Sequence, residues 1–493
     1  MSQIRKLAGQ TAIYGLSSIL GRVLNFLLVP LHTMYLSREE YGQNTDLYSL
    51  AAFLIVVLTY GFETAFFKFS EDRRFDPERV YSTAARSILL SSILFLAIFS
   101  MFHGNIVDLL RYQEHPEYVW IMFVIVCMDA IAAIPFARLR SKNRAVRFVV
   151  VKMALILTNV ALNLYFFWLA PRWIAGEWPM VELVQWTYIP NYGVGYVFLA
   201  NLVASTVMLI MLVPEFRFMK AGFDKVIWRS MLRYGYPLMI AGLAGVANEM
   251  IDRQLIKYLL PQGVAEEQLG IYGAVYKLSI FLVLFNQAFR YAAEPFFFSS
   301  EKDKNAPATF ARVMDLFVLI LGLGFVAILV FLPWLKHFID EKFWEGLYIL
   351  PILLAANVFL GINTNLSVWY KLSGKTWYGM VITYVGLIFT LGFNLYLIPR
   401  LGYEGAAWAT LVSYFAMMVT SYLTGARNYP IPYDLVKIGS ALAISFVAGY
   451  LSLLWAKPTF VPQLMVFAIF LILMGLLFRT DVARLVATVK QRL

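Results

Sequence analysis

Ionisable and amide side chains lie inside the long apolar stretches of this sequence, and they are the residues best suited to chemistry. A charged side chain at bilayer depth costs about 2.5 to 3.5 kcal/mol on insertion scales, so it needs a partner or a water-filled cavity. Arginine also donates paired hydrogen bonds to phosphate groups. We therefore expect five basic or amide side chains to line a cavity for an anionic ligand: Arg22, Asn25, Arg253, Lys277 and Arg290.

Acidic side chains in the same stretches are candidates for taking up a proton or a sodium ion. They are Glu63, Glu249, Asp252 and Glu294. Local neutralisation is the alternative, because Glu249 and Arg253, like Arg290 and Glu294, are four residues apart on a helix. Glu63 and Glu294 could also serve as anchors at the membrane interface.

Helical spacing places these polar residues on narrow faces. At about 100° per residue, those of the first stretch fall within a stripe roughly 80° wide. That stripe contains Thr11, Ser18, Arg22, Asn25 and His32. We expect it to face the interior of a helix bundle, with His32 as a satisfied polar residue rather than a proton relay.

Two later stretches repeat this arrangement. In the seventh apolar stretch, small residues share a helix face with charged ones. Small residues allow the close approach of another helix or a ligand. That face contains Gly242, Gly245, Glu249, Asp252 and Arg253. In the eighth, Gln287, Arg290 and Glu294 cluster within about 60°, while Lys277 is turned away by roughly 80° to 140°.

Composition identifies an integral membrane protein. The 493 residues are 60% hydrophobic and 14% charged, with a mean hydropathy of +0.69, whereas soluble chains are about 25% charged. The net charge of +11 does not indicate nucleic-acid binding, because the basic residues gather in short loops between apolar stretches. No Walker loop is present, and four histidines and one cysteine make no convincing metal set. We expect no enzyme, metal or cofactor beyond a coupling H⁺ or Na⁺.

The apolar stretches predict an all-α fold with about 14 transmembrane helices. A span needs about 18 or more apolar residues, and roughly fourteen stretches meet this length. The first is expected at residues 9–35, the seventh at 234–256, the eighth at 271–297 and the last at 462–478. The first exceeds the roughly 7 to 15 apolar residues of a signal peptide, so we expect it to remain as a span.

An internal duplication organises these spans. Residues 14–72 have a second version that opens at Tyr234, and in both a glutamate, Glu63 or Glu294, precedes paired phenylalanines. Such halves fit a transporter whose lobes rock around a central site. We expect two pseudo-symmetric six-helix lobes at residues 1–214 and 234–424, joined by a cytoplasmic amphipathic linker at 215–233. Two further helices and a basic tail follow at 425–493. An ordinary solvated linker is the alternative for residues 215–233.

Loop charge predicts the orientation. Lys and Arg are retained on the cytoplasmic side, and they concentrate in alternate loops, for example at residues 138–147. We therefore expect a multi-pass protein of the cell's cytoplasmic (inner) membrane with both termini in the cytoplasm.

Three segments carry a resemblance to a known superfamily. They read YGLSSILGRVLNFLLVPLHTMYLSREEYG, IPFARLRSKNRAVRFVVVKMALILTNVALNLYFF and SGKTWYGMVITYVGLIFTLGFNLYLIPRLGYEGAAWATLVSYF. The chain resembles the multidrug/oligosaccharidyl-lipid/polysaccharide (MOP) exporter superfamily, in its polysaccharide-exporter and flippase branch. The resemblance implies two six-helix lobes around a central cavity and alternating access driven by an ion gradient. The two extra C-terminal spans resemble those of lipid II flippases, where such helices line a groove for the lipid tail.

The leading hypothesis is a flippase for a polyprenyl-diphosphate-linked oligosaccharide, such as a surface-polysaccharide or lipopolysaccharide repeat unit. Its expected partners are that substrate, membrane lipids, and a polysaccharide polymerase or glycosyltransferases. Three alternatives stay open: a lipid II flippase for peptidoglycan, a cation-coupled multidrug antiporter, and a non-transporting scaffold for glycan assembly.

Overall fold

The structure is a computed structural model, and it describes residues 20–176, 179, 181–301, 303, 305–454, 460–479 and 481. Within these residues every regular element is a helix. The chain forms two compact units, the first ending at Gln254 and the second beginning at Leu255. The all-α membrane fold expected from composition is confirmed.

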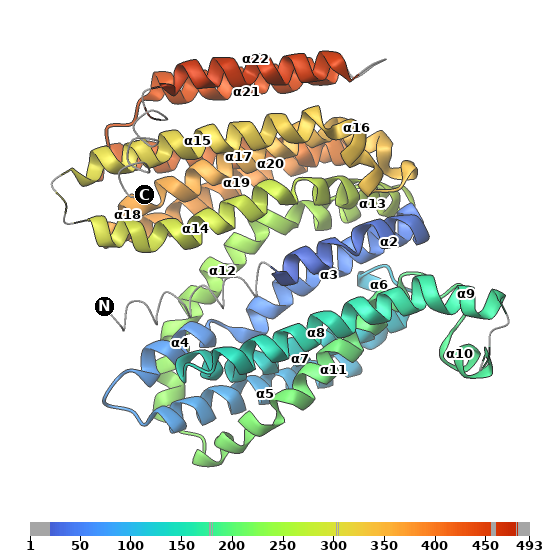
Figure 1. Cartoon of the computed structure of the whole chain (residues 1–493). Coiled ribbons are helices and arrows are strands. Elements are labelled where there is room, and N and C mark those ends of the chain that lie inside the picture. The colour runs from blue at the N-terminus through green and yellow to red at the C-terminus, as the bar shows by residue number, and fades with distance from the viewer. Residues whose placement is uncertain are drawn as a thin grey trace. The chain divides into compact units, whose positions relative to one another are not determined.

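Unit 1 consists of a helical bundle, shown in blue to green in Figure 1. Its elements are α2 (Val29–Tyr35), α3 (Arg38–Thr59), α4 (Phe62–Ser70), α5 (Pro77–Met101), α6 (His103–Leu109), α7 (Pro116–Ser141), α8 (Ala145–Leu164), η1 (Tyr165–Leu169), α9 (Ala170–Ala175), α10 (Val181–Thr187), α11 (Gly195–Phe216), η2 (Arg217–Ala221) and α12 (Lys225–Leu259), which ends in unit 2. Helix α7 is central, because α3, α5 and α11 all pack against it. Its sequence is accordingly mostly apolar and has no single polar face, as expected of a helix with neighbours on several sides.

Unit 2 is shown in green to red in Figure 1. Its elements are α13 (Val264–Leu278), α14 (Ile280–Ser300), α15 (Ala306–Val330), α16 (Leu332–Leu335), η3 (Lys336–Phe338), η4 (Glu341–Ile349), α17 (Leu350–Leu366), α18 (Val368–Leu372), α19 (Trp377–Leu401), α20 (Tyr403–Asn428), α21 (Leu435–Leu454) and α22 (Val461–Leu477). Helix α20 packs against α17 and α19, while α21 and α22 pair with each other and cover α15.

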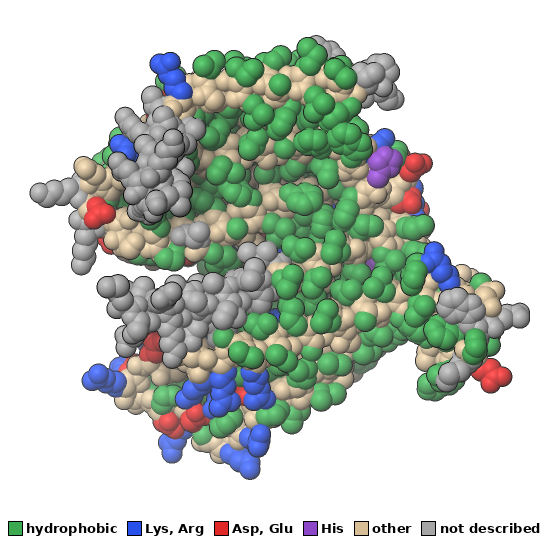
Figure 2. Space-filling view, in the orientation of Figure 1, with side chains coloured by type: hydrophobic (Ala, Val, Ile, Leu, Met, Phe, Trp, Pro, Cys, Tyr) green, Lys and Arg blue, Asp and Glu red, His purple; other side chains and the backbone are tan. Residues whose placement is uncertain are grey.

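Ten helical segments of the described residues are long and apolar enough to cross a membrane, or eleven if the bent pair α13 and α14 is one span. The expected number of fourteen transmembrane helices is therefore not reached within the described residues. The first expected span lies partly outside the described residues, α12 is too polar over its length, and α22 has only 17 residues. Figure 2 shows why the class is nonetheless clear, because apolar side chains cover the helix faces of each unit.

The eighth expected span is broken rather than continuous. Helices α13 and α14 meet at Ser279 with a bend of 49°. The Ser279 hydroxyl donates to the main-chain oxygen of Tyr276 at 2.7 Å. Such bonding back to the preceding turn bends helices, and it separates the ends of the span that carry Lys277 and Arg290.

The second span also bends, at Tyr60 and Gly61 between α3 and α4. Gly61 has a φ of +75°, and a Cβ atom there would lie 2.5 Å from the main-chain oxygen of Gly235 in α12. Only glycine allows both this left-handed conformation and this approach. The bend therefore places α12 directly against the end of α3.

The structure places residues 215–233 at the end of α11, in η2 and in the first turns of α12. Ile227 and Met231 are buried, and Met219 accepts hydrogen bonds from Ser82 and Arg86 of α5. These contacts attach the segment to unit 1. The lobe and linker limits expected from the sequence stay predictions.

Candidate functional site

Arg22 lies on the helical segment that precedes α2, and its side chain is exposed. Its neighbour Gly21 faces α8, where a Cβ atom would come within 2.7 Å of Ile156. The glycine thus lets the segment approach α8 closely. In the part of the chain that the structure describes, Arg22 has no hydrogen-bond or ion-pair partner, so its guanidinium group is available to a ligand.

A ladder of amide groups continues from Arg22 along the same two helices. Asn159 of α8 donates to the Asn25 side chain at 3.4 Å, and Asn163 donates to the main-chain oxygen of Asn159 at 2.8 Å. His32 Nε2 lies 2.7 Å from Asn163 Oδ1, and both side chains are buried. His32 is thus hydrogen-bonded, as expected for a satisfied polar residue. Thr11 and Ser18, the rest of the predicted stripe, lie outside the described residues.

Sequence reasoning missed the α8 half of this ladder. Asn159 and Asn163 are four residues apart in an apolar stretch, and that spacing alone predicts a polar stripe on one helix face. The stripe matches that of the first helix, so the pairing could have been proposed before the structure.

The charged face of α12 contains Glu249, Asp252 and Arg253. Arg253 Nη1 donates to Asp252 Oδ1 at 2.8 Å and also to the main-chain oxygen of Glu249. Asp252 and Arg253 are buried, whereas the Glu249 side chain is exposed. Arg253 is therefore held by its immediate neighbours, and Glu249 is left facing outward from the helix.

Asp46 is a buried carboxylate that the sequence did not single out, because it lies one residue before residues 47–67, where the second span is expected. Gln254 Nε2 donates to Asp46 Oδ1 at 2.7 Å, and the Tyr112 hydroxyl donates to Asp46 Oδ2 at 2.8 Å. Gln254 also donates to Ser49 at 2.7 Å. This cluster links α3 to the charged end of α12.

Asp129 of α7 and Lys152 of α8 form a second charged group inside unit 1. Asp129 accepts a hydrogen bond of 3.1 Å from Ser205 of α11 and interacts electrostatically with Lys152. The Lys152 ammonium group also lies 4.6 Å from the centroid of the Phe136 ring. Both side chains are partly buried, so two opposite charges share the apolar interior of the bundle without a direct ion pair among the described residues.

We expect Asp129→Asn and Lys152→Met each to lower the stability of the protein by about 1 to 3 kcal/mol, because each leaves a partly buried charge without the opposite charge nearby. The double variant should recover most of that loss. Thermal unfolding of the detergent-purified protein measures both effects, with Asp108→Asn, a change on the short helix α6, as the control. A double variant as unstable as the sum of the two single ones would show that the charges do not interact.

Equivalent ion pairs occur in the two units. Glu63 of α4 pairs with Arg140 of α7, and Glu294 of α14 pairs with Lys371 of α18. The partners are 77 residues apart in both cases. This equal separation is what an internal duplication predicts. It also gives Glu294 a partner other than Arg290, its neighbour four residues earlier.

The remaining expected cavity residues lie in unit 2. Lys277 is exposed in the last turn of α13, and its side chain is not free of contacts. Arg290 is exposed on α14, with its guanidinium carbon 5.7 Å from the centroid of the Tyr291 ring. In the described residues, no group of three or more His, Cys, Asp or Glu is placed to hold a metal ion.

Two bundles of apolar spans with charged and amide side chains on selected faces are typical of a membrane transporter, and several solved structures share the fold. The chain is similar to the lipid II flippase MurJ in an inward closed conformation, with a TM-score of 0.71 and 14% identity over 95% of this chain and 99% of that one. It is also similar to an inward-facing multidrug resistance MATE transporter of the MOP superfamily (TM-score 0.61, 14% identity, 85% and 95% covered). A third similar structure is that of the MATE multidrug transporter DinF-BH (TM-score 0.58, 14% identity, 87% and 96% covered).

These likenesses define the class, a multi-pass membrane protein with the fold of the MOP transporters and flippases. The family follows from the sequence. Residues 7–301 match the model described as "Polysaccharide biosynthesis protein", and the chain belongs to that family of the MOP superfamily. No curated protein sequence gave a match.

Proposed function

We propose that this protein is a flippase that moves a polyprenyl-diphosphate-linked oligosaccharide across the cytoplasmic membrane. The family supports the glycan substrate, and the fold supports movement by alternating access. The observation that carries the proposal furthest is the exposed, unpaired Arg22, within the described residues, on a helix that otherwise packs through Gly21 and amide groups. A guanidinium group in this position suits the diphosphate of such a substrate.

The proposed substrate site comprises Arg22, Asn25, Arg253, Lys277 and Arg290. A polar site of this kind hides the sugar and the diphosphate from hydrocarbon while the polyprenyl tail stays in lipid. Coupling to an H⁺ or Na⁺ gradient is assigned to Glu63, Glu249, Asp252 and Glu294, as in an antiporter. Of these, the exposed Glu249 has the side chain most accessible to an ion. Both termini are proposed to be cytoplasmic, with a polymerase or glycosyltransferases as partners.

Reconstituted transport tests the proposal. Purified protein in liposomes should translocate a fluorescent polyprenyl-diphosphate oligosaccharide, and an imposed proton or sodium gradient should accelerate the movement. Faster movement of the oligosaccharide than of lipid II would support the leading proposal. Transport of a free cationic dye alone would instead identify a multidrug antiporter. No movement of any probe by folded protein would favour a scaffold of a glycan-assembly complex.

A lipid II flippase is the second candidate, because the similarity to MurJ covers 95% of this chain at a TM-score of 0.71. At 14% identity that likeness concerns the fold, whereas the family match concerns polysaccharide biosynthesis. Depletion in cells separates the two, since loss of a lipid II flippase stops wall synthesis and loss of an oligosaccharide flippase stops only the surface polysaccharide.

A further inference from the structure

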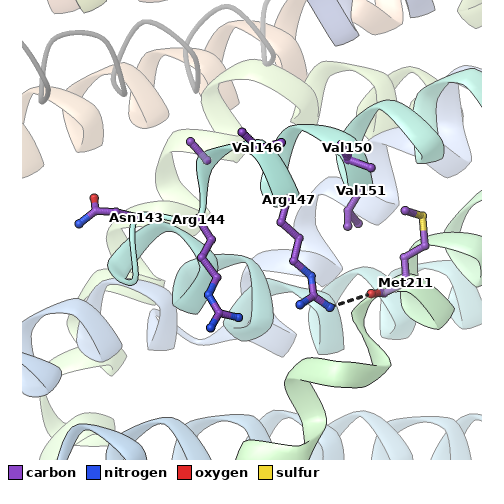
Figure 3. A pocket seen from close by; sticks show the side chains of 8 residues that line it. Asn143, Arg144, Val146, Arg147, Val150, Val151 and Met211 are labelled. Carbon is purple, nitrogen blue, oxygen red and sulfur yellow. Dashed lines mark hydrogen bonds between the residues drawn. The ribbon is translucent and has the colours of Figure 1, made fainter.

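A pocket opens on unit 1 where the α7–α8 turn and the start of α8 meet α11. Its volume is about 810 Å³. Arg144 and Arg147 project from the first turns of α8 toward the part of α11 that carries Met211, and Arg147 donates to the Met211 main-chain oxygen at 3.4 Å (Figure 3). The pocket therefore has two guanidinium groups on one wall.

The charge of this region is not balanced by the protein. Arg138 Nη1 already pairs with Glu215 at 2.6 Å, and Arg147 and Arg144 lie farther from the same carboxylate, at 3.0 and 3.6 Å. Lys142 and Arg138 share Glu78, so four basic side chains face two acidic ones. Over the described part of the chain, the Arg144 side chain makes no hydrogen bond, and 48% of it is exposed. An external anion can therefore bind without displacing an internal one.

The same pocket has an apolar side. Val146 and Val150 of α8 line it and are 75% and 50% exposed. They belong to a segment long and apolar enough to cross a membrane. Figure 2 shows blue side chains gathered at this end of unit 1 next to a green helix surface. Phosphate-binding groups thus adjoin a surface suited to a hydrocarbon chain.

We propose that this pocket binds an anionic diacyl phospholipid of the surrounding bilayer. Its headgroup phosphate accepts hydrogen bonds from Arg144 and Arg147, and one acyl chain lies along Val146 and Val150. Basic pockets between helices at the cytoplasmic face bind anionic headgroups in this way, and positive loop charge predicts that face for the α7–α8 turn. A soluble anion would use the arginines but would leave the exposed valines without a partner.

Native mass spectrometry of the full chain in detergent tests the site, with palmitoyl-oleoyl phosphatidylglycerol and phosphatidylcholine as the probes. We expect phosphatidylglycerol to bind more tightly, and Arg144→Gln to weaken that binding by about fivefold, which is the effect of one basic residue near an anionic lipid. Arg73→Gln is the matched control, because it removes an exposed arginine of unit 1 outside the pocket.

A second pair of variants leaves the arginines in place. Val146→Asp puts an acidic group in the first turn of α8, where a helix tolerates it well. It should weaken phosphatidylglycerol binding at least as much as Arg144→Gln does. Val146→Asn, of similar size but neutral, should weaken it less, because it removes only the apolar contact and adds no repelling charge. Equal binding by Arg144→Gln and Arg73→Gln, equal binding of the two lipids, or displacement of phosphatidylglycerol by an equal concentration of a polyprenyl diphosphate would each overturn the proposal.

Discussion

Replacing Arg138 with methionine should lower the stability of unit 1 by about 3 to 5 kcal/mol, because it leaves a buried carboxylate without its main partner. Arg138 donates to Glu215 at 2.6 Å and to Glu78 at 3.1 Å, and the Glu215 side chain has no exposed surface. Arg147 still reaches Glu215 at 3.0 Å, so we expect the effect near the lower end of this range.

Arg138 also fixes the connection between α11 and α12. Its guanidinium carbon lies 3.5 Å from the centroid of the Phe218 ring in η2 and 5.1 Å from that of Tyr81 in α5. The Tyr81 hydroxyl donates to the main-chain oxygen of Glu215 at 3.0 Å. Loss of the arginine therefore removes an ion pair and a packing contact at the same place.

Thermal unfolding followed by size-exclusion chromatography measures the Arg138 effect. The double variant Arg138→Met with Glu215→Leu should regain more than half of the lost stability, because apolar replacement of a whole buried pair is often nearly neutral. Arg74→Met is the control, since the Arg74–Asp72 pair is exposed and solvent-screened and contributes little to stability. An Arg138 variant as stable as the Arg74 variant would contradict the assignment.

The sequence predicts the helices well because hydropathy and local chemistry determine them. Ser37 and Glu40 illustrate this at the start of α3, where the Ser37 hydroxyl accepts from the Glu40 amide at 3.1 Å and the Glu40 carboxylate accepts from the Ser37 amide at 2.7 Å. Such a capping box can be recognised from residue spacing. The duplication was equally visible, through the phenylalanines that follow Glu63 and Glu294.

Partners distant in sequence could not be predicted in the same way. Helical periodicity places Arg290 beside Glu294, but it carries no information about Lys371, which reaches Glu294 from another helix. Asp46 was overlooked for a related reason: hydropathy placed it at the edge of a span, whereas Gln254 and Tyr112 enclose it in the structure. The role of a buried carboxylate can be recognised only when the groups that donate hydrogen bonds to it are known.

Arg22→Ala should reduce transport of the lipid-linked oligosaccharide by at least about tenfold, because each hydrogen bond to a charged group contributes about 1.5 to 3 kcal/mol. Protein abundance should not change, since Arg22 is exposed and stabilises no other residue among those described. The transport rate of Arg22→Lys should lie between those of the unmodified protein and Arg22→Ala, because lysine keeps the charge but cannot form the paired contact. Flux per folded molecule in liposomes is the measurement.

Arg73→Ala is the matched control for Arg22, because it removes an exposed arginine from the loop between α4 and α5. If both variants transport equally well, Arg22 does not contact the diphosphate. If Arg22→Ala slows transport of the charged substrate but not of an uncharged short-chain lipid analogue, the loss lies in recognition of the headgroup. The difference between these two substrates therefore distinguishes a phosphate contact from a general effect on the movement of the helices.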